Sequence, residues 1–571
     1  MCAPLGTPLL RARLGRATFP PCPVKTGRQI LRKAVAREDN PWRLSRVLVC
    51  LGFTIWLAAA GTALAQKQGG VLRQHIPDNP ASLSIHEEST VTGERPAMPI
   101  FNNLVLFDQS VARNSMASIV PDLAETWSWN EDGTKLTFRL RQGVKWHDGK
   151  PFTSADVKCT WDMLRGLGAE KLRINPRRSW YDNLVEVTVP GPYEAVFVLK
   201  RRQPAFLALL ATGMSPVYPC HVSPAAMRQQ PVGTGPFKFA EFKPNESIKL
   251  VRNPDYWKPG RPYLDGIEYE LSRSRSTAIL AFIAGKYDLT FAGVLTVPLT
   301  RDLQKQRPDA ICELPPGSVS TNLIVNRLRP PFDNPEIRKA MALVLDRRAF
   351  VEILSEGQGN LAIAMQPMPG GLWGTPPEML SKMPGYGTDI AERQAKAVEI
   401  MKSLGYGPGK RLAVKVSTRD VPPYRDPAII LIDQLKTIFI DGELEVLDTT
   451  QWFPKVLRKD YSVALNLTGT FVDDPDAVLY ENFSCGGQGN YNAYCDKDIE
   501  ALIDRQSMER DQDKRREIVW EIERRLLADD AKPLIQFNRA GVCWDPAVKG
   551  LTVNTNSIYN GWRMEDVWLN R

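Results

Sequence analysis

The chain has few histidines and none of the local motifs on which many catalytic sites depend. Only four histidines occur in 571 residues. We find no G-x-S-x-G nucleophile elbow, no phosphate-binding loop, no G-x-G-x-x-G that opens a helix and no H-E-x-x-H zinc motif. His86-Glu87-Glu88 begins like the zinc motif, but Thr90 stands where its second histidine would be. Cys-x-x-Cys is also absent, which disfavours zinc ribbons and thioredoxin-type redox sites. The sequence therefore predicts neither a metal site nor a cofactor.

An excess of positive charge is missing from most of the chain. The formal net charge is +9, from 73 Lys and Arg against 64 Asp and Glu. Ten of the basic residues and two of the acids lie within residues 1–65, so the remainder has a formal charge of +1. Because nucleic-acid-binding proteins need a basic surface, we exclude nucleic acid as a partner.

Residues 1–65 have the composition of a leader and signal peptide. Arg43 and Arg46 precede an uncharged apolar run over residues 47–65, which ends in Ala63-Leu64-Ala65. Basic residues, an apolar segment and an Ala-x-Ala ending are typical of a secretory signal, so we predict export and cleavage after Ala65. The alternative is a retained membrane anchor on a tethered sensor domain, because the run is just long enough to span a bilayer.

The first half of the remaining chain has the pattern of strands. From Gln66 to about Val222, and again from Gly233 to Asp288, apolar and polar residues alternate, as in residues 135–140 and 193–199. This alternation is typical of half-buried strands. Between them, Thr153-Ser-Ala-Asp156 is a capping-box variant that predicts a helix through Leu164, ending at Gly166.

From about Pro335 onward, helical and strand patterns alternate. Asn334 is a suitable N-cap, Pro335 suits the first helical position, and Ile337, Met341, Leu345 and Phe350 recur near helical spacing. Further predicted helices cover residues 390–404, 427–440, 452–457 and 497–527, and predicted strands cover 412–417, 444–447, 461–467 and 533–537. Such alternation favours crossover units on a largely parallel sheet. Two differently built lobes on one chain predict a cleft between them, where small ligands preferentially bind.

Aromatic and charged residues are the first candidates for ligand contact. Fourteen tryptophans occur, most of which should fill the core. Trp452 and nearby Arg458 are our preferred pair for stacking on and charge contact with a ligand. Asp473, Asp474 and Asp476 could supply paired carboxylates, so a secreted hydrolase stays open as an alternative. A solvent-exposed turn is the simpler interpretation of this acidic cluster.

Four groups of residues carry a family resemblance, and they occur in the family's order. They are Pro121-Asp-Leu-Ala-Glu-Thr-Trp127 with residues 132–152 and Ala155-Asp-Val157; Val232-Gly-Thr-Gly-Pro-Phe-Lys238 with Arg252-Asn-Pro-Asp-Tyr-Trp257; Asn334-Pro-Glu-Ile-Arg-Lys-Ala-Met341; and Asp474-Pro-Asp476 before Asn490-Tyr491. Together they resemble the peptide/nickel-binding family of solute-binding proteins of bacterial ABC importers. The likeness covers essentially the whole chain after residue 65.

The resemblance implies an α/β, two-lobed periplasmic-binding-protein fold of type II, in its large three-subdomain version with a hinge and an interlobe cleft. Residues 66–104, 225–318 and 541–571 would form a discontinuous lobe I. Residues 105–224 would form an inserted subdomain, and residues 319–540 would form lobe II. Closure of the lobes about the connecting strands would trap a ligand.

The resemblance also implies positions for ligand contact. In peptide-binding members, an acidic residue just ahead of the Asp-Pro segment anchors the ligand's α-amino group. Thr470 stands at that position here, and Asp473 is the nearest candidate to replace the acid. This departure argues against ordinary dipeptide recognition. We add His86, in a polar segment of the surface or the cleft edge, to the predicted ligand contacts.

Six cysteines remain after Ala65, and two of them flank a glycine-rich stretch. On spacing alone, Cys485 and Cys495 are equally compatible with a disulfide and with two free thiols. The dipeptide-binding relative has a disulfide in the matching loop. The resemblance therefore implies a Cys485–Cys495 bridge.

The function implied by the resemblance is capture rather than catalysis. A periplasmic receptor would bind a small polar solute, such as a peptide or peptide-like molecule, and deliver it to the transmembrane subunits of an ABC permease. We expect a monomer without enzymatic activity or cofactor. The ligand class stays open, because the family also includes binders of nickel complexes, sugars and opines.

Overall fold

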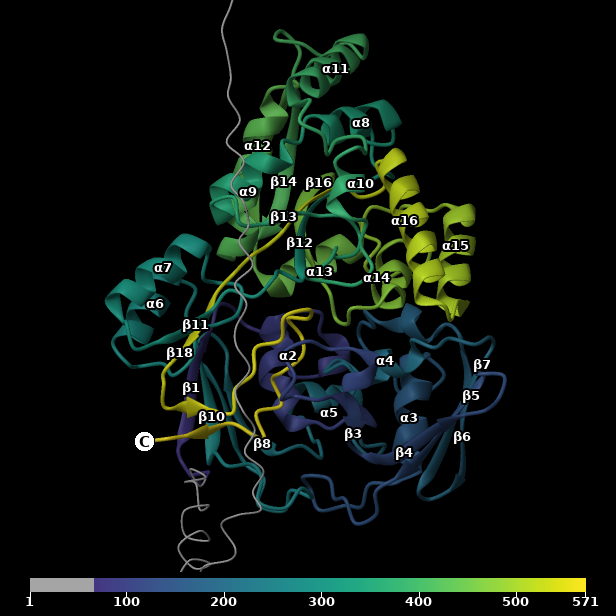
Figure 1. Cartoon of the computed structure of the whole chain (residues 1–571), viewed down its shortest axis with the longest axis vertical. Coiled ribbons are helices and arrows are strands. Elements are labelled where there is room, and N and C mark those ends of the chain that lie inside the picture. Colours follow the sequence, from purple (N-terminus) through teal and green to yellow (C-terminus); the bar gives the residue numbers. More distant parts are fainter. Residues whose placement is uncertain (1–65) are drawn as a thin grey trace, which may run out of the picture. The chain divides into compact units, whose positions relative to one another are not determined.

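A computed structural model describes residues 66–571, so the predicted leader, signal peptide and cleavage site lie outside the described residues (Figure 1). This part of the chain contains two four-stranded sheets, one six-stranded sheet and three two-stranded pairs. Within the same residues, no helix is long and apolar enough to cross a membrane. The large sheets are divided between two lobes: lobe I contains the two four-stranded sheets, and lobe II contains the six-stranded sheet.

The first four-stranded sheet joins segments that are far apart in the sequence. Its order is β1 (Val71–Ile76), β10 (Gly266–Leu271), β9 (Ser247–Arg252) and β8 (Phe237–Lys243). β1 is parallel to β10, whereas β10, β9 and β8 pair antiparallel. Because the other four-stranded sheet lies between β1 and β8 in the sequence, this lobe is built from a discontinuous stretch of chain.

The second four-stranded sheet is wholly antiparallel and carries a capped helix. Its order is β4 (Ala124–Trp129), β5 (Lys135–Leu140), β7 (Glu194–Leu199) and β6 (Leu184–Gly191). Helix α3 (Ser154–Leu164) packs against β6 and β7. Its N-cap is Thr153, whose backbone N–H donates to the Asp156 carboxylate at 2.9 Å, which confirms the predicted capping box.

Short elements complete lobe I. They are the strands β2 (Val105–Phe107), β3 (Ile119–Pro121), β19 (Val548–Lys549) and β20 (Trp568–Leu569), the helices α2 (Val91–Ala97), α4 (Phe206–Ala211), α5 (Pro224–Gln229), α6 (Arg275–Ile283) and α7 (Val297–Gln306), and the 3-10 turns Ile85–Glu87, Met98–Ile100, Met116–Ser118 and Arg178–Tyr181. One continuous hydrophobic core joins both four-stranded sheets.

The six-stranded sheet of lobe II is mixed, so the prediction of a largely parallel sheet was wrong. Its order is β13 (Asn360–Leu361), β17 (Leu534–Phe537), β12 (Val319–Val325), β16 (Val463–Gly469), β14 (Leu412–Arg419) and β15 (Ile440–Leu447). Only the β16–β14 and β14–β15 pairs are parallel. β12 and β17 pair antiparallel with their neighbours. Alternation of helix and strand along the sequence does not encode the direction in which each strand enters the sheet.

Two of the predicted helices in lobe II are interrupted, in each case by an aspartate that caps a new helix. The helix that starts at Pro335 ends at Leu343, and the Asp346 side chain caps the next one. The predicted helix over residues 497–527 is likewise two helices, because the Asp511 side chain accepts from the backbone N–H groups of Asp513 and Lys514. A capping aspartate satisfies the free N–H groups of a first turn, which favours a new start over continuation.

The helices of lobe II surround its sheet (Figure 1). They are α8 (Pro335–Leu343), α9 (Arg347–Ser355), α10 (Pro377–Leu380), α11 (Ile390–Ser403), α12 (Pro422–Lys436), α13 (Thr449–Leu457), α14 (Pro475–Asn482), α15 (Lys497–Met508) and α16 (Gln512–Ala528). α12 starts five residues before the predicted start at Pro427, since Val421 is its N-cap. Separate hydrophobic cores lie under the sheet and among α14, α15 and α16.

The chain crosses between the lobes on two adjacent strands. β11 (Ile311–Glu313) leads toward β12, and β18 (Val542–Trp544) follows β17 on the return. The two strands pair antiparallel, with Cys312 opposite Cys543, and a disulfide joins these two residues. The crossings are therefore held together both by a short ladder and by a covalent bond.

Two more disulfides lie away from the crossings. Cys485 and Cys495 are bonded, which confirms the bridge implied by the family resemblance. Cys159 on α3 is bonded to Cys220. All six cysteines of the described residues are thus paired, in agreement with export to an oxidising compartment.

Candidate functional site

A cavity with a volume of about 170 Å³ lies between the lobes. Lobe I contributes residues 89–92, 291–294 and part of 553–562, the crossings contribute 315–319 and part of 538–542, and lobe II contributes parts of 419–424, 466–469 and 481–491. Liquid water occupies about 30 Å³ per molecule, so this space corresponds to roughly six waters. It is large enough for a small organic ligand.

Aromatic rings form much of the apolar wall. Phe291, Phe453, Phe471, Tyr559 and Trp562 all line the cavity. The rings of Phe471 and Tyr559 are stacked, with their centroids 4.2 Å apart and their planes at 25°. Such a wall favours a ligand that has apolar or aromatic groups to pack against it.

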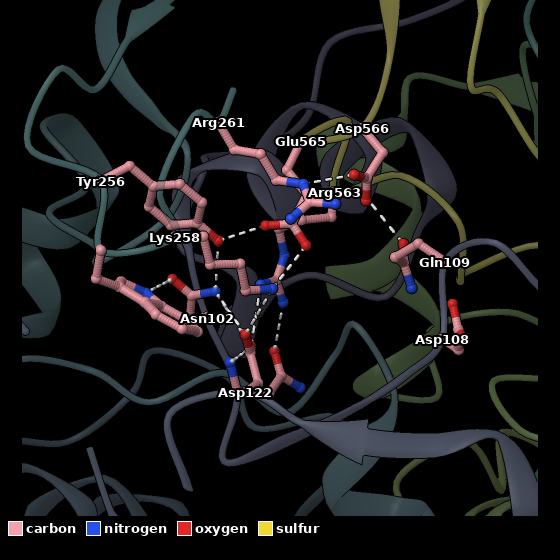
Figure 2. A network of polar contacts seen from close by, with 12 residues as sticks. Asn102, Asp108, Gln109, Asp122, Tyr256, Lys258, Arg261, Arg563, Glu565 and Asp566 are labelled. Carbon is pink, nitrogen blue, oxygen red and sulfur yellow. Dashed lines mark hydrogen bonds and ion pairs between the residues drawn. The ribbon is translucent and has the colours of Figure 1, made fainter. Parts of the chain in front are cut away.

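A buried polar network fixes the C-terminal segment that supplies part of this wall. Figure 2 shows the Arg563 side chain directed at Asp122, and the two are joined by a 3.0 Å hydrogen bond although neither is exposed. Lys258 donates to Glu565 at 2.7 Å and lies 3.4 Å from Asp122. Burial would raise the pKa of Asp122, but the two cations outweigh it and lower the pKa. The network therefore anchors the segment that carries Trp562.

Arg419 places a positive charge on the cavity wall at the end of β14. Its guanidinium donates through Nε to the Thr449 hydroxyl at 3.0 Å and lies 4.7 Å from the centre of the Tyr424 ring. Thr449 in turn donates to Asp78 of lobe I. The side chain is 4% exposed, and its Nη1 has no acceptor within residues 66–571. A fixed guanidinium with a free N–H edge is suited to binding a carboxylate.

Glu481 places a negative charge on the same wall. It lies in the last turn of α14 and is 8% exposed. Its Oε2 is buried and has no hydrogen-bond partner among the described residues. Burial raises the pKa of Glu481 to about 7, although Arg177 and Lys532 act in the opposite direction.

Trp452 and Arg458 lie away from this wall. Trp452 is fully buried in lobe II, where it packs with Val456 and Tyr461. Arg458 is exposed at the end of α13. Successive residues of a helix point about 100° apart, so Phe453 faces the cavity while its neighbour Trp452 faces the core.

Thr470, Asp473 and His86 are also absent from the residues that line the cavity within the described part of the chain. Thr470 borders a smaller pocket beside Lys532. Burial raises the pKa of half-buried Asp473 to about 7, and its carboxylate accepts from the Leu372 backbone N–H at 3.4 Å. Ligand contact by these residues stays a prediction.

The His86-Glu87-Glu88 segment is buried, which corrects its interpretation as a polar surface segment. The imidazole of His86 is 2.9 Å from the Pro216 carbonyl, and burial lowers its pKa to about 3. Glu87 forms a 3.0 Å ion pair with Arg228. The segment is polar because its groups have internal partners, not because they face water.

The acidic cluster of the hydrolase alternative is held inside lobe II. Asp474 caps α14 and receives two hydrogen bonds from Arg515, at 2.7 and 2.8 Å. Asp476 is fully buried and accepts from Gln506 at 2.7 Å. Two of the three carboxylates thus stabilise the fold, and the prediction of a solvent-exposed turn was wrong for them.

Sequence reasoning missed both charged residues of the cavity wall. Arg419 could have been found from the sequence, because it is the last residue of a strand that has parallel neighbours, β14. Ligands commonly bind at the carboxyl ends of such strands. No sequence signal distinguished Glu481, which lies on a helix among other buried residues.

The arrangement of two lobes, two crossings and an interlobe cavity defines a type II ligand-binding fold, and the comparisons agree. The profile of the bacterial extracellular solute-binding proteins, family 5 Middle, matches residues 118–490. The chain therefore belongs to this family of solute-binding proteins.

Characterised relatives share a quarter of the sequence over most of their length. The Dipeptide-binding protein of Pseudomonas aeruginosa PAO1 is 25% identical over 475 residues, which cover 77% of this chain and 84% of the relative. Heme-binding protein A of Haemophilus influenzae is 27% identical over 334 residues, covering 54% and 57% of the two chains.

Solved structures share the fold. DppA of Helicobacter pylori in complex with the peptide STSA has a TM-score of 0.77 at 21% identity, with 88% of this chain and 99% of that chain covered. AgaA of A. tumefaciens in complex with agropinic acid has a TM-score of 0.75 at 23% identity, with 88% and 99% covered.

Proposed function

We propose that this chain is the exported capture subunit of an ABC importer, which binds a small peptide or peptide-like carboxylate in the interlobe cavity. Several relatives are named as di- or tripeptide-binding proteins, and the family is one of extracellular solute-binding proteins. Such a subunit releases its ligand unchanged, without a cofactor, to the transmembrane subunits of a permease. It acts in the periplasm as a monomer, after cleavage at Ala65.

Arg419 is the observation that carries this proposal. It is the one cation among the described residues that line the cavity, and Thr449 and Tyr424 fix its orientation. A peptide with a free carboxylate would occupy the unpaired edge of the guanidinium, and its side chains would pack on the aromatic wall. A cavity of about 170 Å³ favours a small ligand, such as a dipeptide.

The lobes would close about the two crossings to trap this ligand. We assign residues 66–104, 225–318 and 541–571 to lobe I, 105–224 to its inserted subdomain and 319–540 to lobe II. β11 and β18 support these boundaries, since each lies at a change of lobe. Residues at these crossings are placed to absorb the change in backbone angles on closure.

Native mass spectrometry of residues 66–571 tests capture directly. We expect one small, chemically unchanged passenger per chain. Incubation with a panel of dipeptides should then leave every member intact. Hydrolysis of a panel member by the purified protein would contradict the proposal and favour the hydrolase.

Isothermal titration with Arg419→Met tests the role of the guanidinium. Removing one partner of a buried charge pair costs about 2–5 kcal/mol, so binding of a free dipeptide should weaken by roughly 30-fold or more. Binding of the same peptide with an amidated C-terminus should be weak in both proteins. The matched control is Arg411→Met, because Arg411 adjoins the other end of β14 and pairs with Asp441 on the surface. Equal affinities of wild type and Arg419→Met would contradict the proposal.

A further inference from the structure

The cavity has an acid, but not at the position that the family resemblance implies. Thr470 occupies that position and carries no charge, and its backbone N–H is bonded to the Ser318 carbonyl at 2.8 Å. Asp473 is engaged with Leu372 and Asn556 and does not line the cavity. Among the described lining residues, Glu481 is the one carboxylate.

The Glu481 carboxylate is desolvated and has no ion-pair partner among the described residues, although the Trp180 side chain acts on it as a hydrogen-bond donor that lowers its pKa. No cation of the described residues lies within 4 Å of it, and its buried Oε2 accepts no hydrogen bond there. The two nearby cations bond elsewhere. Arg177 donates to the backbone carbonyls of Glu88 and Ile85 at 2.6 and 2.7 Å, and Lys532 donates to Thr468 and Asn482 at 3.0 and 2.9 Å. An unpaired buried carboxylate is costly, so a bound cation would be strongly favoured.

Glu481 and Arg419 line the same cavity, and both influence other groups in its wall. Burial is the main cause that raises the pKa of Tyr491, which lines the cavity; Glu481 raises this pKa further and Arg419 lowers it. Burial likewise raises the pKa of Tyr559, another lining residue, and Glu481 and Arg419 act on it in the same opposite directions. A negative and a positive group therefore flank one small cavity, which matches the charge pattern of a zwitterion.

We propose that Glu481 accepts the ammonium group of the ligand, in place of the acid that is absent at Thr470. The ligand class is then a zwitterion of dipeptide size that has both a free amine and a free carboxylate. This inference rests on the proposed function, in which Arg419 binds the carboxylate.

The test compares free dipeptides with their N-acetylated forms by isothermal titration. Wild type should bind the free form roughly 10- to 100-fold more tightly, since a hydrogen-bonded charged group is lost on acetylation. Glu481→Gln should bind the free form more weakly by a similar factor and should lose most of the discrimination between the two forms. The matched control is Glu517→Gln, an exposed position on α16 away from the cavity, which should behave as wild type. Thermal unfolding of each variant checks that the fold is retained.

The outcomes separate this inference from the proposed function. Unchanged discrimination in Glu481→Gln, with binding still dependent on Arg419, would overturn the role of Glu481 and leave the capture of carboxylates intact. Equal binding of free and acetylated peptides by wild type would overturn it without any mutation. Failure of wild type to bind any peptide would remove both proposals.

Discussion

Arg515 holds together the buried acidic cluster, and its removal should be one of the most destabilising single changes in lobe II. Its guanidinium contacts both Asp474, at 2.7 and 2.8 Å, and Asp476, at 3.2 Å. The Asp476 carboxylate also accepts hydrogen bonds from neutral donors, among them Ser507 at 2.8 Å, and these would remain if Arg515 were removed. Asp474 has no other side-chain donor within the described residues. The perturbation that we consider is Arg515→Met.

The cost of this change is limited by protonation of Asp474. Burial already raises the pKa of this carboxyl, and Arg515 opposes the rise. Without Arg515, we expect the Asp474 carboxyl to be neutral in the folded state. In the unfolded chain its pKa is about 3.9, so pH 7 lies about three units above it. At 1.36 kcal/mol per unit, keeping the carboxyl protonated at pH 7 costs about 4 kcal/mol. Since the folded variant then binds more protons than the unfolded chain, its stability falls as the pH rises. The loss relative to wild type should therefore shrink to about 1.5 kcal/mol at pH 5.

Urea unfolding followed by tryptophan fluorescence at pH 7 and pH 5 measures this loss. Asp474→Asn in the Arg515→Met background should recover much of it, because the amide needs no proton. The matched control is Arg516→Met, since Arg516 pairs on the surface with Asp513 and should contribute less than about 1 kcal/mol. A loss of equal size at both pH values would refute the electrostatic account.

Two further predictions concern the covalent structure. Serine at both Cys312 and Cys543 should lower the free energy of unfolding by about 5 kcal/mol, against about 3 kcal/mol for Cys485 and Cys495, because the bridges close sequence separations of 231 and 10 residues. Equal losses in urea unfolding would speak against this chain-entropy account. N-terminal sequencing of the exported protein should begin at Gln66, whereas a membrane-bound product that retains residues 47–65 would indicate an anchor.

Much of the local structure could be predicted from the sequence because its causes lie within a few residues. The capping box at Thr153 and the N-cap at Asn334 start helices where predicted. The alternating pattern of residues 135–140 is strand β5. The ordered phrases of the family led to the correct fold and to the Cys485–Cys495 bridge.

The candidate site could be predicted only in kind. The sequence indicated an interlobe cleft with aromatic and charged walls, but Trp452 and Thr470, which it proposed as ligand contacts, do not line the cavity, whereas Phe453 and Glu481 do. A residue's type shows what it can bind, whereas its rotation about a helix and the packing of neighbouring segments decide what it faces.

Residue patterns along the chain were therefore enough to predict the family, many of the helices and strands and the two-lobed architecture. Three features became evident from the folded chain alone: the strand directions of the six-stranded sheet, the pairing of Cys312 with Cys543, and the presence of Arg419 and Glu481 in the wall of one cavity. These features depend on contacts between segments that are far apart in the chain, and no local pattern of residue types records them.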